Sequence, residues 1–252
     1  IFLKKIMSEK CPSCKSTKTQ IVFGKNVYGG SNKQHFYKCT NCQIVYLYPK
    51  LEKKYEKKFY ELKFEEYMDL RSKNEIKWDN PRDHLLSNKH EFKRRSKFLK
   101  KEYLSGKNIL EIGSSSGFML KPFKKLNSNL FGVEPSSKFR EYTNNIDIKT
   151  FKNIDDAIKL KKNSIDLLLH YYVLEHIDSP ILFLKKIMKL LKRNGLMIFE
   201  VPNINDPLIT IFKTKNFDNF YWSVVHHWYF SALTLGNLLK KNNFKFSFYF
   251  DQ

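Results

Sequence analysis

The stretch Asn108-Ile-Leu-Glu-Ile-Gly-Ser-Ser-Ser-Gly-Phe-Met-Leu120 decides the fold of this chain. Its apolar run, Ile109 to Ile112, is typical of a strand that is buried on both faces of a parallel sheet. Gly113 and Gly117 then permit a tight turn in which backbone approaches a ligand without an intervening Cβ. The amphipathic segment that follows begins with free backbone N–H groups, which bind carboxylates, phosphates or ribose hydroxyls. The stretch therefore predicts a strand, a turn and a helix, with a weak signal for nucleotide binding.

The next short apolar run begins at Leu130 and ends in an acid, Glu134. An acid at the end of the second strand of a doubly wound sheet hydrogen-bonds ribose hydroxyls, and such a charge-assisted bond contributes about 1.5–3 kcal/mol. We therefore predict that Glu134 binds a ribose. The alternative is a solvated glutamate at the end of a strand.

Four motifs, taken in order, resemble those of class I S-adenosylmethionine-dependent methyltransferases. They are Glu111-Ile-Gly-Ser-Ser-Ser-Gly117, Gly132-Val-Glu-Pro-Ser136, Asp166-Leu-Leu-Leu-His-Tyr-Tyr-Val-Leu-Glu-His-Ile177 and Leu191-Lys-Arg-Asn-Gly-Leu-Met-Ile-Phe-Glu-Val-Pro-Asn203. The resemblance covers about residues 90 to 250 and is strongest to small-molecule methyltransferases of glycan and natural-product pathways. Ser115 departs from the pattern, because the family usually has a glycine in the middle of the loop.

This resemblance implies an α/β fold with a doubly wound, mostly parallel sheet, and S-adenosylmethionine as the methyl donor. It assigns donor binding to Glu111, Gly113, Ser115, Gly117, Glu134, Pro135, Asp155, Tyr171 and Tyr172. Asp155, which it places beside the adenine, and Asp156 are equally suited to cap the helix that follows. The alternation of apolar runs and helical segments predicts strands at 108–112, 129–133, 146–150, 165–170, 196–201 and 244–250.

All four cysteines lie near the start of the chain, as Cys11-Pro-Ser-Cys14 and Cys39-Thr-Asn-Cys42. Two such turns direct four thiolates at one tetrahedral ion and leave no position for water, so we predict a structural zinc. Zinc contributes about 10–16 kcal/mol of apparent folding free energy, enough to order a segment with little core. Strand-like runs at 19–23 and 34–38 complete a zinc ribbon. The redox alternative, disulfides or a thioredoxin-like pair, fits a cytosolic chain poorly.

We expect three consecutive parts: a zinc ribbon over 1–48, a helical linker or lid over 49–105, and the S-adenosylmethionine-binding domain over 106–252. This order is similar to that of zinc-headed members of the same family. The linker carries tyrosines at helical spacing, which either close over cofactor and substrate or simply pack. They are Tyr55, Tyr60 and Tyr67.

The formal net charge of +21 suggests phosphate-bearing partners such as nucleic acid. Lysines are nevertheless scattered through nearly every helical segment, beside many Asn, Ile, Phe and Tyr, so we favour solvated lysine faces. No run reaches the ~20 apolar residues of a membrane span, and Ile1–Ile6 is too short for a signal-peptide core. We therefore expect a cytoplasmic protein, although a first residue other than Met suggests that the sequence begins within a longer chain.

The predicted reaction is direct transfer of the sulfonium methyl group to an oxygen, nitrogen or carbon of a small polar acceptor. The resemblance suggests a sugar, a sugar nucleotide or a related metabolite of bacterial surface glycan synthesis. His176, after the strand at 165–170, either accepts a proton from the acceptor or orders the loop. His226 and His227 are the other candidate bases; they lie in the aromatic stretch Phe217–Ser231, for which the alternatives are substrate contact, packing and metal binding.

Two other functions compete. One is RNA methylation, favoured by the charge, but His170-Tyr-Tyr-Val173 replaces the Asn/Asp-Pro-Pro-Tyr used on base amino groups, and no cysteine remains as a nucleophile. The other is a non-catalytic module that binds nucleic acid or protein. Finally, only one strand-like run, 244–250, follows the fifth strand where this class usually has two. We expect either that the chain is part of a longer protein or that this edge is covered.

Overall fold

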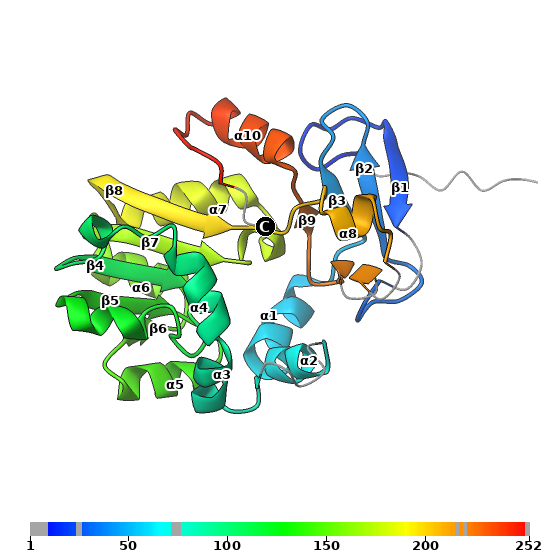
Figure 1. Cartoon of the computed structure of the whole chain (residues 1–252). Helices are drawn as coiled ribbons and strands as arrows, with labels where there is room; N and C mark the ends of the chain where they lie inside the picture. The colour runs from blue at the N-terminus through cyan, green and yellow to red at the C-terminus, as the bar shows by residue number, and fades with distance from the viewer. Residues whose placement is uncertain (1–9, 24–26, 72–76, 215–216, 219–220, 250–252) are drawn as a thin grey trace, which may run out of the picture. The chain divides into compact units, whose positions relative to one another are not determined.

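The computed structural model describes residues 10–23, 27–71, 77–214, 217–218 and 221–249. The chain forms two compact units, drawn in Figure 1. Unit 1 comprises Ile1–Leu51, Leu174–Ile181 and Val201–Gln252, and unit 2 comprises Glu52–Val173 and Leu182–Glu200. The domain boundaries predicted at residues 48 and 105 follow sequence order and stay a prediction.

Unit 2 contains a five-stranded sheet in the order β6-β5-β4-β7-β8, in which every neighbouring pair is parallel. The order reverses beside β4, so β4 and its neighbours form the switch point of a doubly wound sheet. The strands are β4 (Asn108–Ile112), β5 (Asn129–Val133), β6 (Lys149–Phe151), β7 (Ile165–Tyr171) and β8 (Leu191–Glu200). The prediction of a doubly wound, mostly parallel α/β sheet is confirmed.

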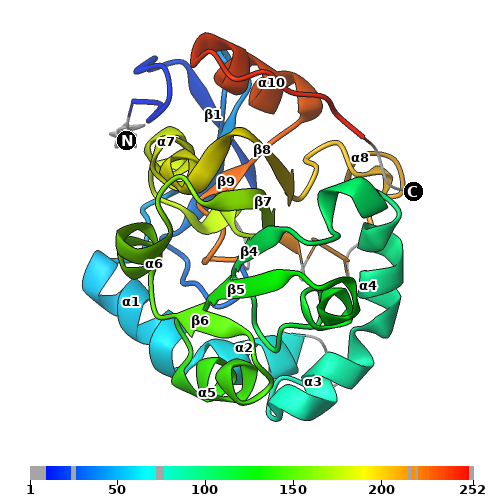
Figure 2. The same cartoon turned by 90° about the vertical axis from the view of Figure 1, so that its left-hand side faces the viewer.

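Helices cover both faces of this sheet, with α6 and α7 on one face and α4 on the other in Figure 2. The helices of unit 2 are α1 (Lys53–Leu62), α2 (Phe64–Arg71), α3 (Pro81–Ser87), α4 (Lys89–Ser96), α5 (Ser137–Asn145), α6 (Ile154–Lys161) and most of α7 (Pro180–Ile187), with 3₁₀ turns η1 (Lys101–Tyr103), η2 (Lys121–Leu126) and η4 (Met188–Leu190). The cap of α6 is Asn153, whose side chain accepts from the backbone N–H of Asp156 at 3.0 Å. The proposed capping role of Asp155 or Asp156 is therefore wrong: they lie two and three residues after the cap, inside the first turn of α6.

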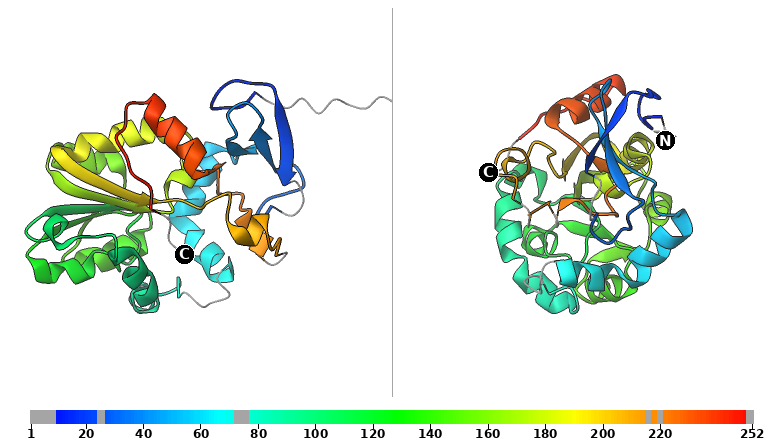
Figure 3. Two further views of the ribbon diagram at one scale, coloured as in Figure 1. Left: turned by 45° about the horizontal axis from the view of Figure 1, so that its top comes forward. Right: turned by 90° about the vertical axis from the view of Figure 1, so that its right-hand side faces the viewer.

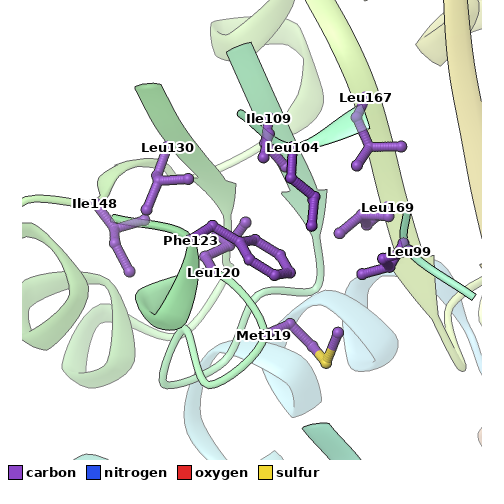
Figure 4. Close-up of a cluster of buried hydrophobic side chains, with 10 residues drawn as sticks. All are labelled: Leu99, Leu104, Ile109, Met119, Leu120, Phe123, Leu130, Ile148, Leu167 and Leu169. Carbon is purple, nitrogen blue, oxygen red and sulfur yellow. The ribbon is translucent and has the colours of Figure 1, made fainter. Parts of the chain in front are cut away.

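The core of unit 2 fills the space between β4 and the segment that follows its loop, as Figure 4 shows. Here the predicted amphipathic helix is instead a series of turns ending in η2. Pro122 lacks the N–H that an α-helical turn needs, and Asn127 ends η2 in the left-handed region. The apolar side chains still point inward: Leu99, Leu104, Ile109, Met119, Leu120, Phe123, Leu130, Ile148, Leu167 and Leu169 form one buried cluster.

Unit 1 contains a four-stranded antiparallel sheet in the order β1-β2-β3-β9. Its strands are β1 (Thr19–Phe23), β2 (His35–Cys39), β3 (Val45–Tyr48) and β9 (Trp228–Tyr229), and its helical segments are η3 (Leu174–His176), α8 (Pro207–Thr210) and α10 (Ala232–Lys241). Figure 3 shows the early strands of this sheet in blue; β9, from late in the chain, joins them by pairing antiparallel with β3. Ser231 caps α10 by accepting from the N–H of Thr234.

Three predicted strands need correction. The strand expected at 146–150 is Lys149–Phe151, and the one expected at 196–201 begins earlier, at Leu191. The one expected at 244–250 is absent over 244–249; residue 250 lies outside the described part. Alternating aromatic residues produced the error, because Phe246 and Phe248 instead lie against Gly236 of α10, where an added Cβ would be 3.2 Å from the ring of Phe248. In the described residues, no helix is long and apolar enough to cross a membrane.

Candidate cofactor, metal and histidine sites

In the loop after β4, the backbone at two glycines packs closely against neighbouring side chains. Gly113 and Gly117 both have φ of +73°, and an added Cβ would lie 2.9 Å from Val173 Cγ2 and 2.8 Å from Ile148 Cδ1 respectively. Any other residue there is strained and crowded. Ser115 also has a positive φ, of 41°. The serine thus adopts the conformation for which the family uses glycine.

Glu134, just after β5, is tied to this loop. Its carboxylate accepts the backbone N–H of Ser115 at 2.8 Å and that of Ser136 at 2.9 Å. Gly132 makes room for the approach, because a Cβ there would lie 2.5 Å from Ser114 Oγ. Glu134 is only 8% exposed, and this burial raises its pKa to about 7 although the two N–H groups oppose the shift. The structure therefore places two predicted cofactor residues in direct contact.

Several buried polar atoms beside this loop have no hydrogen-bond partner among the described residues: Glu111 Oε2, Ser114 Oγ, Tyr171 Oη and His84 Nε2. Buried polar groups in folded proteins are nearly always hydrogen-bonded, so these atoms are suited to bind a polar ligand. Burial raises the pKa of Glu111 to about 8, with Arg95 opposing the shift. A neutral Glu111 donates a hydrogen bond as well as accepting one, which suits a ligand rich in hydroxyl and amino groups.

Tyr171 and Tyr172, at the end of β7, are held by an ion-pair network that sequence reasoning missed. Glu200 of β8 accepts from Arg95 Nε at 3.1 Å and from Tyr172 Oη at 3.0 Å. Arg94 pairs with the same carboxylate at 2.8 Å. The guanidinium of Arg95 also lies 4.5 Å from the ring centre of Tyr171, a cation–π contact. No sequence signal joins α4 to β8, because the partners are about a hundred residues apart.

His84 of α3 is a second residue that sequence reasoning missed. Its Nδ1 lies 2.8 Å from Ser116 Oγ in the glycine-rich loop, and its ring centre lies 4.2 Å from that of Trp78. Burial lowers the pKa of His84 to about 3, so the ring is neutral at physiological pH. The only available signal is Asn80-Pro81, which marks the start of the helix that carries it.

The remaining predicted cofactor residues lie at the surface of unit 2. Pro135 follows Glu134, and its carbonyl accepts from Arg140 at 2.9 Å. Asp155, in the first turn of α6, is largely exposed and pairs with Lys186 at 2.8 Å. A groove of about 510 Å³ begins at Ser136, the partner of Glu134, and is lined opposite by α1 and α2. The helical segment predicted as a linker or lid thus forms one wall of a groove beside the ribose-binding candidate.

The four cysteines of unit 1 converge. Cys11 Sγ lies 3.7 Å from Cys42 Sγ, and Cys14 Sγ lies 3.6 Å from Cys39 Sγ, with all four within 4.8 Å of one another. Zn–S bonds of about 2.3 Å in a tetrahedron place sulfur atoms about 3.8 Å apart, so the spacing fits zinc. All four are free thiols, which does not agree with the disulfide alternative. Asn41 Nδ2 donates to Cys14 Sγ at 3.6 Å, a contact typical of the surroundings of a thiolate.

The three histidines predicted to be catalytic all lie in unit 1. The rings of His176 and His226 are 4.7 Å apart between centres, and Glu175 lies beside them. His227 is buried, and its backbone N–H donates to the carbonyl of Glu175 at 2.7 Å. The aromatic segment around them is also buried, with Tyr221, Trp222 and Trp228 at most 5% exposed. Glu175 was not predicted, although it precedes His176 in the motif.

Comparison with known proteins gives a consistent result. A family model described as "Methyltransferase domain" matches residues 84–246. Two ubiquinone biosynthesis O-methyltransferases are similar: that of Bradyrhizobium diazoefficiens is 30% identical over 112 residues, covering 40% of this chain and 42% of the relative, and that of Rhodopseudomonas palustris is 29% identical over 124 residues, covering 45% and 46%. The match thus spans less than half the length of these curated relatives.

Two solved structures are also similar. One is a methyltransferase from Thermotoga maritima described as a possible histamine N-methyltransferase, with 23% identity, a TM-score of 0.48, and coverage of 73% of this chain and 80% of that one. The other is from Archaeoglobus fulgidus, with 21% identity, a TM-score of 0.49, and coverage of 63% and 69%. Since the family model spans more than half of the chain, the protein belongs to the methyltransferase domain family, that of the class I S-adenosylmethionine-dependent methyltransferases.

Proposed function

We propose that this protein is an enzyme that transfers the methyl group of S-adenosylmethionine to a small polar acceptor. The observation that carries the proposal is the carboxylate of Glu134, fixed at the end of β5 by the N–H groups of Ser115 and Ser136. A carboxylate has about four lone-pair positions, so two remain for the hydroxyls of a ribose. The site lies at the carboxyl edge of the sheet next to the switch point, where doubly wound folds bind ligands.

Other residues of unit 2 complete the donor site in this proposal. Gly113, Ser115 and Gly117 bring backbone to the ligand, Glu111 and Tyr171 offer buried polar atoms, and Tyr172 is held in place through Glu200. The sequence resemblance also assigns Pro135 to donor binding and places Asp155 beside the adenine. When bound, S-adenosylmethionine supplies a methyl group on a positively charged sulfur.

Transfer itself needs little from the protein beyond position. A lone pair of the acceptor forms the bond to the methyl carbon as the S–CH₃ bond breaks, leaving S-adenosylhomocysteine. Holding both reactants in line supplies ~7–11 kcal/mol of the barrier. If the acceptor is a hydroxyl or amine, its proton passes to a base, and we assign this step to one of His176, His226 and His227. Such a base adds about 10²–10⁴-fold.

Two acceptor classes deserve a test. The sequence resemblance suggests a sugar or sugar nucleotide, as in surface glycan synthesis, whereas the relatives carry names from ubiquinone biosynthesis. The experiment incubates the purified protein with S-adenosylmethionine and panels of both classes and detects a one-methyl mass increase. Failure to bind S-adenosylmethionine would refute the proposal. If the protein binds S-adenosylmethionine but methylates neither panel, the proposed donor stands and the proposed acceptor classes are wrong.

We further propose that Cys11, Cys14, Cys39 and Cys42 bind one structural zinc ion. Four thiolates close the tetrahedron, so no position remains for water or substrate. The ion therefore stabilises the ribbon and takes no part in transfer. The spacing of the sulfur atoms supports this proposal.

A further inference from the structure

A second group of metal-binding side chains lies in unit 1, separate from the four cysteines. Glu175 and His176 come from η3, and His226 comes from the segment before β9. One ligand atom from each lies within 4.8 Å of the others, and His176 Nε2 is 4.0 Å from Glu175 Oε1. The group is largely buried: Glu175 is fully inaccessible, His226 is 4% exposed, and the side chain of His176 is 14% exposed. A carboxylate and two imidazoles thus meet in a site with little access to water.

The hydrogen bonds of the two rings decide which nitrogen faces the group. The Tyr229 hydroxyl donates to the carbonyl of Tyr221, because a carbonyl only accepts. That hydroxyl must therefore accept from His226 Nδ1–H, at 2.7 Å. Likewise the carbonyl of Val225 accepts from His176 Nδ1–H at 2.8 Å. Nδ1 is thus the hydrogen-bond donor in both rings, which leaves Nε2 as the ring atom that can act as a metal ligand.

Three electron-pair donors are therefore gathered in one buried space, which favours a cation among them. Histidines that bind metals usually donate their other ring N–H to a carbonyl, carboxylate or water, as both rings do here. The segments that carry these ligands are also held together, because Trp228 Nε1 of β9 donates to the carbonyl of Ile177, just after η3, at 2.8 Å. We propose that Glu175, His176 and His226 bind a divalent transition-metal ion such as zinc.

The geometry suits such an ion after a small adjustment. Metal–ligand bonds of about 2.0–2.2 Å in a tetrahedron place ligand atoms about 3.4 Å apart. The distances between the ligand atoms must therefore shorten by roughly 1 Å when the ion binds. Three protein ligands leave one position open, unlike the closed thiolate site. An acceptor oxygen bound there would lose its proton more easily. This last consequence, unlike metal binding itself, rests on the proposed function, and it leaves His227 as the histidine available as a base.

The test counts metal ions in the full chain without cofactor or acceptor, so its result does not depend on methyl transfer. Metal-free protein is titrated with Co²⁺, whose thiolate complexes absorb strongly in the near ultraviolet, whereas nitrogen and oxygen ligands give only weak visible bands. Wild type is expected to bind two equivalents, the second without thiolate absorption. His226→Ala should bind one, and His90→Ala, which removes an exposed histidine, should bind two.

A second variant distinguishes loss of the metal site from misfolding of the protein. Tyr229→Phe keeps the ring but removes the hydroxyl that orients His226, and should weaken the second site about 10–100-fold. Circular dichroism of each variant checks the fold. Only one equivalent in wild type, all with thiolate absorption, would overturn the proposal and indicate a shared proton instead. A second equivalent that persists unchanged in both variants would also overturn it.

Discussion

Replacing Glu134 tests the proposed donor site most directly. From sequence alone, Glu134→Ala is expected to weaken S-adenosylmethionine binding at least tenfold with little loss of stability. The structure keeps the first expectation and changes the second, because the carboxylate also accepts two backbone N–H groups in a buried loop. Alanine would leave both N–H groups without their acceptor.

The magnitudes follow from these contacts. A hydrogen bond from ribose to a charged carboxylate contributes about 1.5–3 kcal/mol, so its loss raises the dissociation constant by roughly ten- to a hundredfold. Losing the acceptor of Ser115 N and Ser136 N costs about 1–3 kcal/mol of unfolding free energy. Because the pKa of Glu134 is about 7, the carboxylate fraction grows as pH rises from 6 to 8. Donor affinity should therefore increase with pH and level off above that range.

Calorimetry from pH 6 to 8 measures the affinity, and urea unfolding measures the stability. Glu134→Gln is the matched variant, since it keeps the size of the side chain but cannot ionise, and should bind weakly with no pH dependence. Glu141→Gln, an exposed glutamate of α5, controls for the loss of one negative charge. Wild-type affinity in Glu134→Ala would refute the ribose role, whereas a flat pH profile in wild type would refute only the elevated pKa.

Three further predictions concern other sites. Cys39→Ser should lose one zinc per chain, measured by elemental analysis, and lose hydrogen-exchange protection across 10–48, whereas Ser13→Ala should change neither; no metal in wild type would contradict this. Burial raises the pKa of Glu111 to about 8, so its folded form binds more protons than the unfolded chain between about pH 4.5 and 8, and stability falls as pH rises through that window. Glu111→Gln should therefore stabilise the protein at pH 8, by on the order of a few kcal/mol, and little at pH 5, as urea unfolding would show; equal effects at both pH values would refute the assignment. RNA fragments should bind weakly, lose affinity steeply with salt and remain unmethylated, and sequence-specific methylation at physiological salt would disprove the choice of a small acceptor.

The central strands were predictable because local sequence and tertiary environment agree. β4 and β5 begin and end at the predicted residues, since each is a short apolar run bounded by turn-forming residues. The cysteine pairs were equally clear, because their spacing alone brings sulfur atoms together. The run at 244–249 failed for the opposite reason: its alternating Phe residues suit a strand, but a glycine face on α10 offers them another surface.

The polar contacts around the donor site were less predictable, because they join elements far apart in the chain. Arg95 belongs to α4, which is so rich in charged residues that its sequence indicates a solvent-exposed helix. Yet Arg95 is only 8% exposed and pairs with Glu200 of β8. His84 likewise gains its role only because α3 meets the loop at Ser116. Propensity and spacing describe neighbours in sequence, so neither pair has a signal in the sequence.

The histidine group shows how strongly chemistry depends on strand register. Residues 175 and 226 meet because β9 pairs with β3 through Trp228 and Tyr46, and because His227 N–H binds the Glu175 carbonyl. His226 and His227 both precede β9, so these tertiary contacts, and not local sequence, decide which of them lies beside the carboxylate. The sequence offers two adjacent histidines without choosing between them, and the fold places His226 within reach of Glu175 and His176.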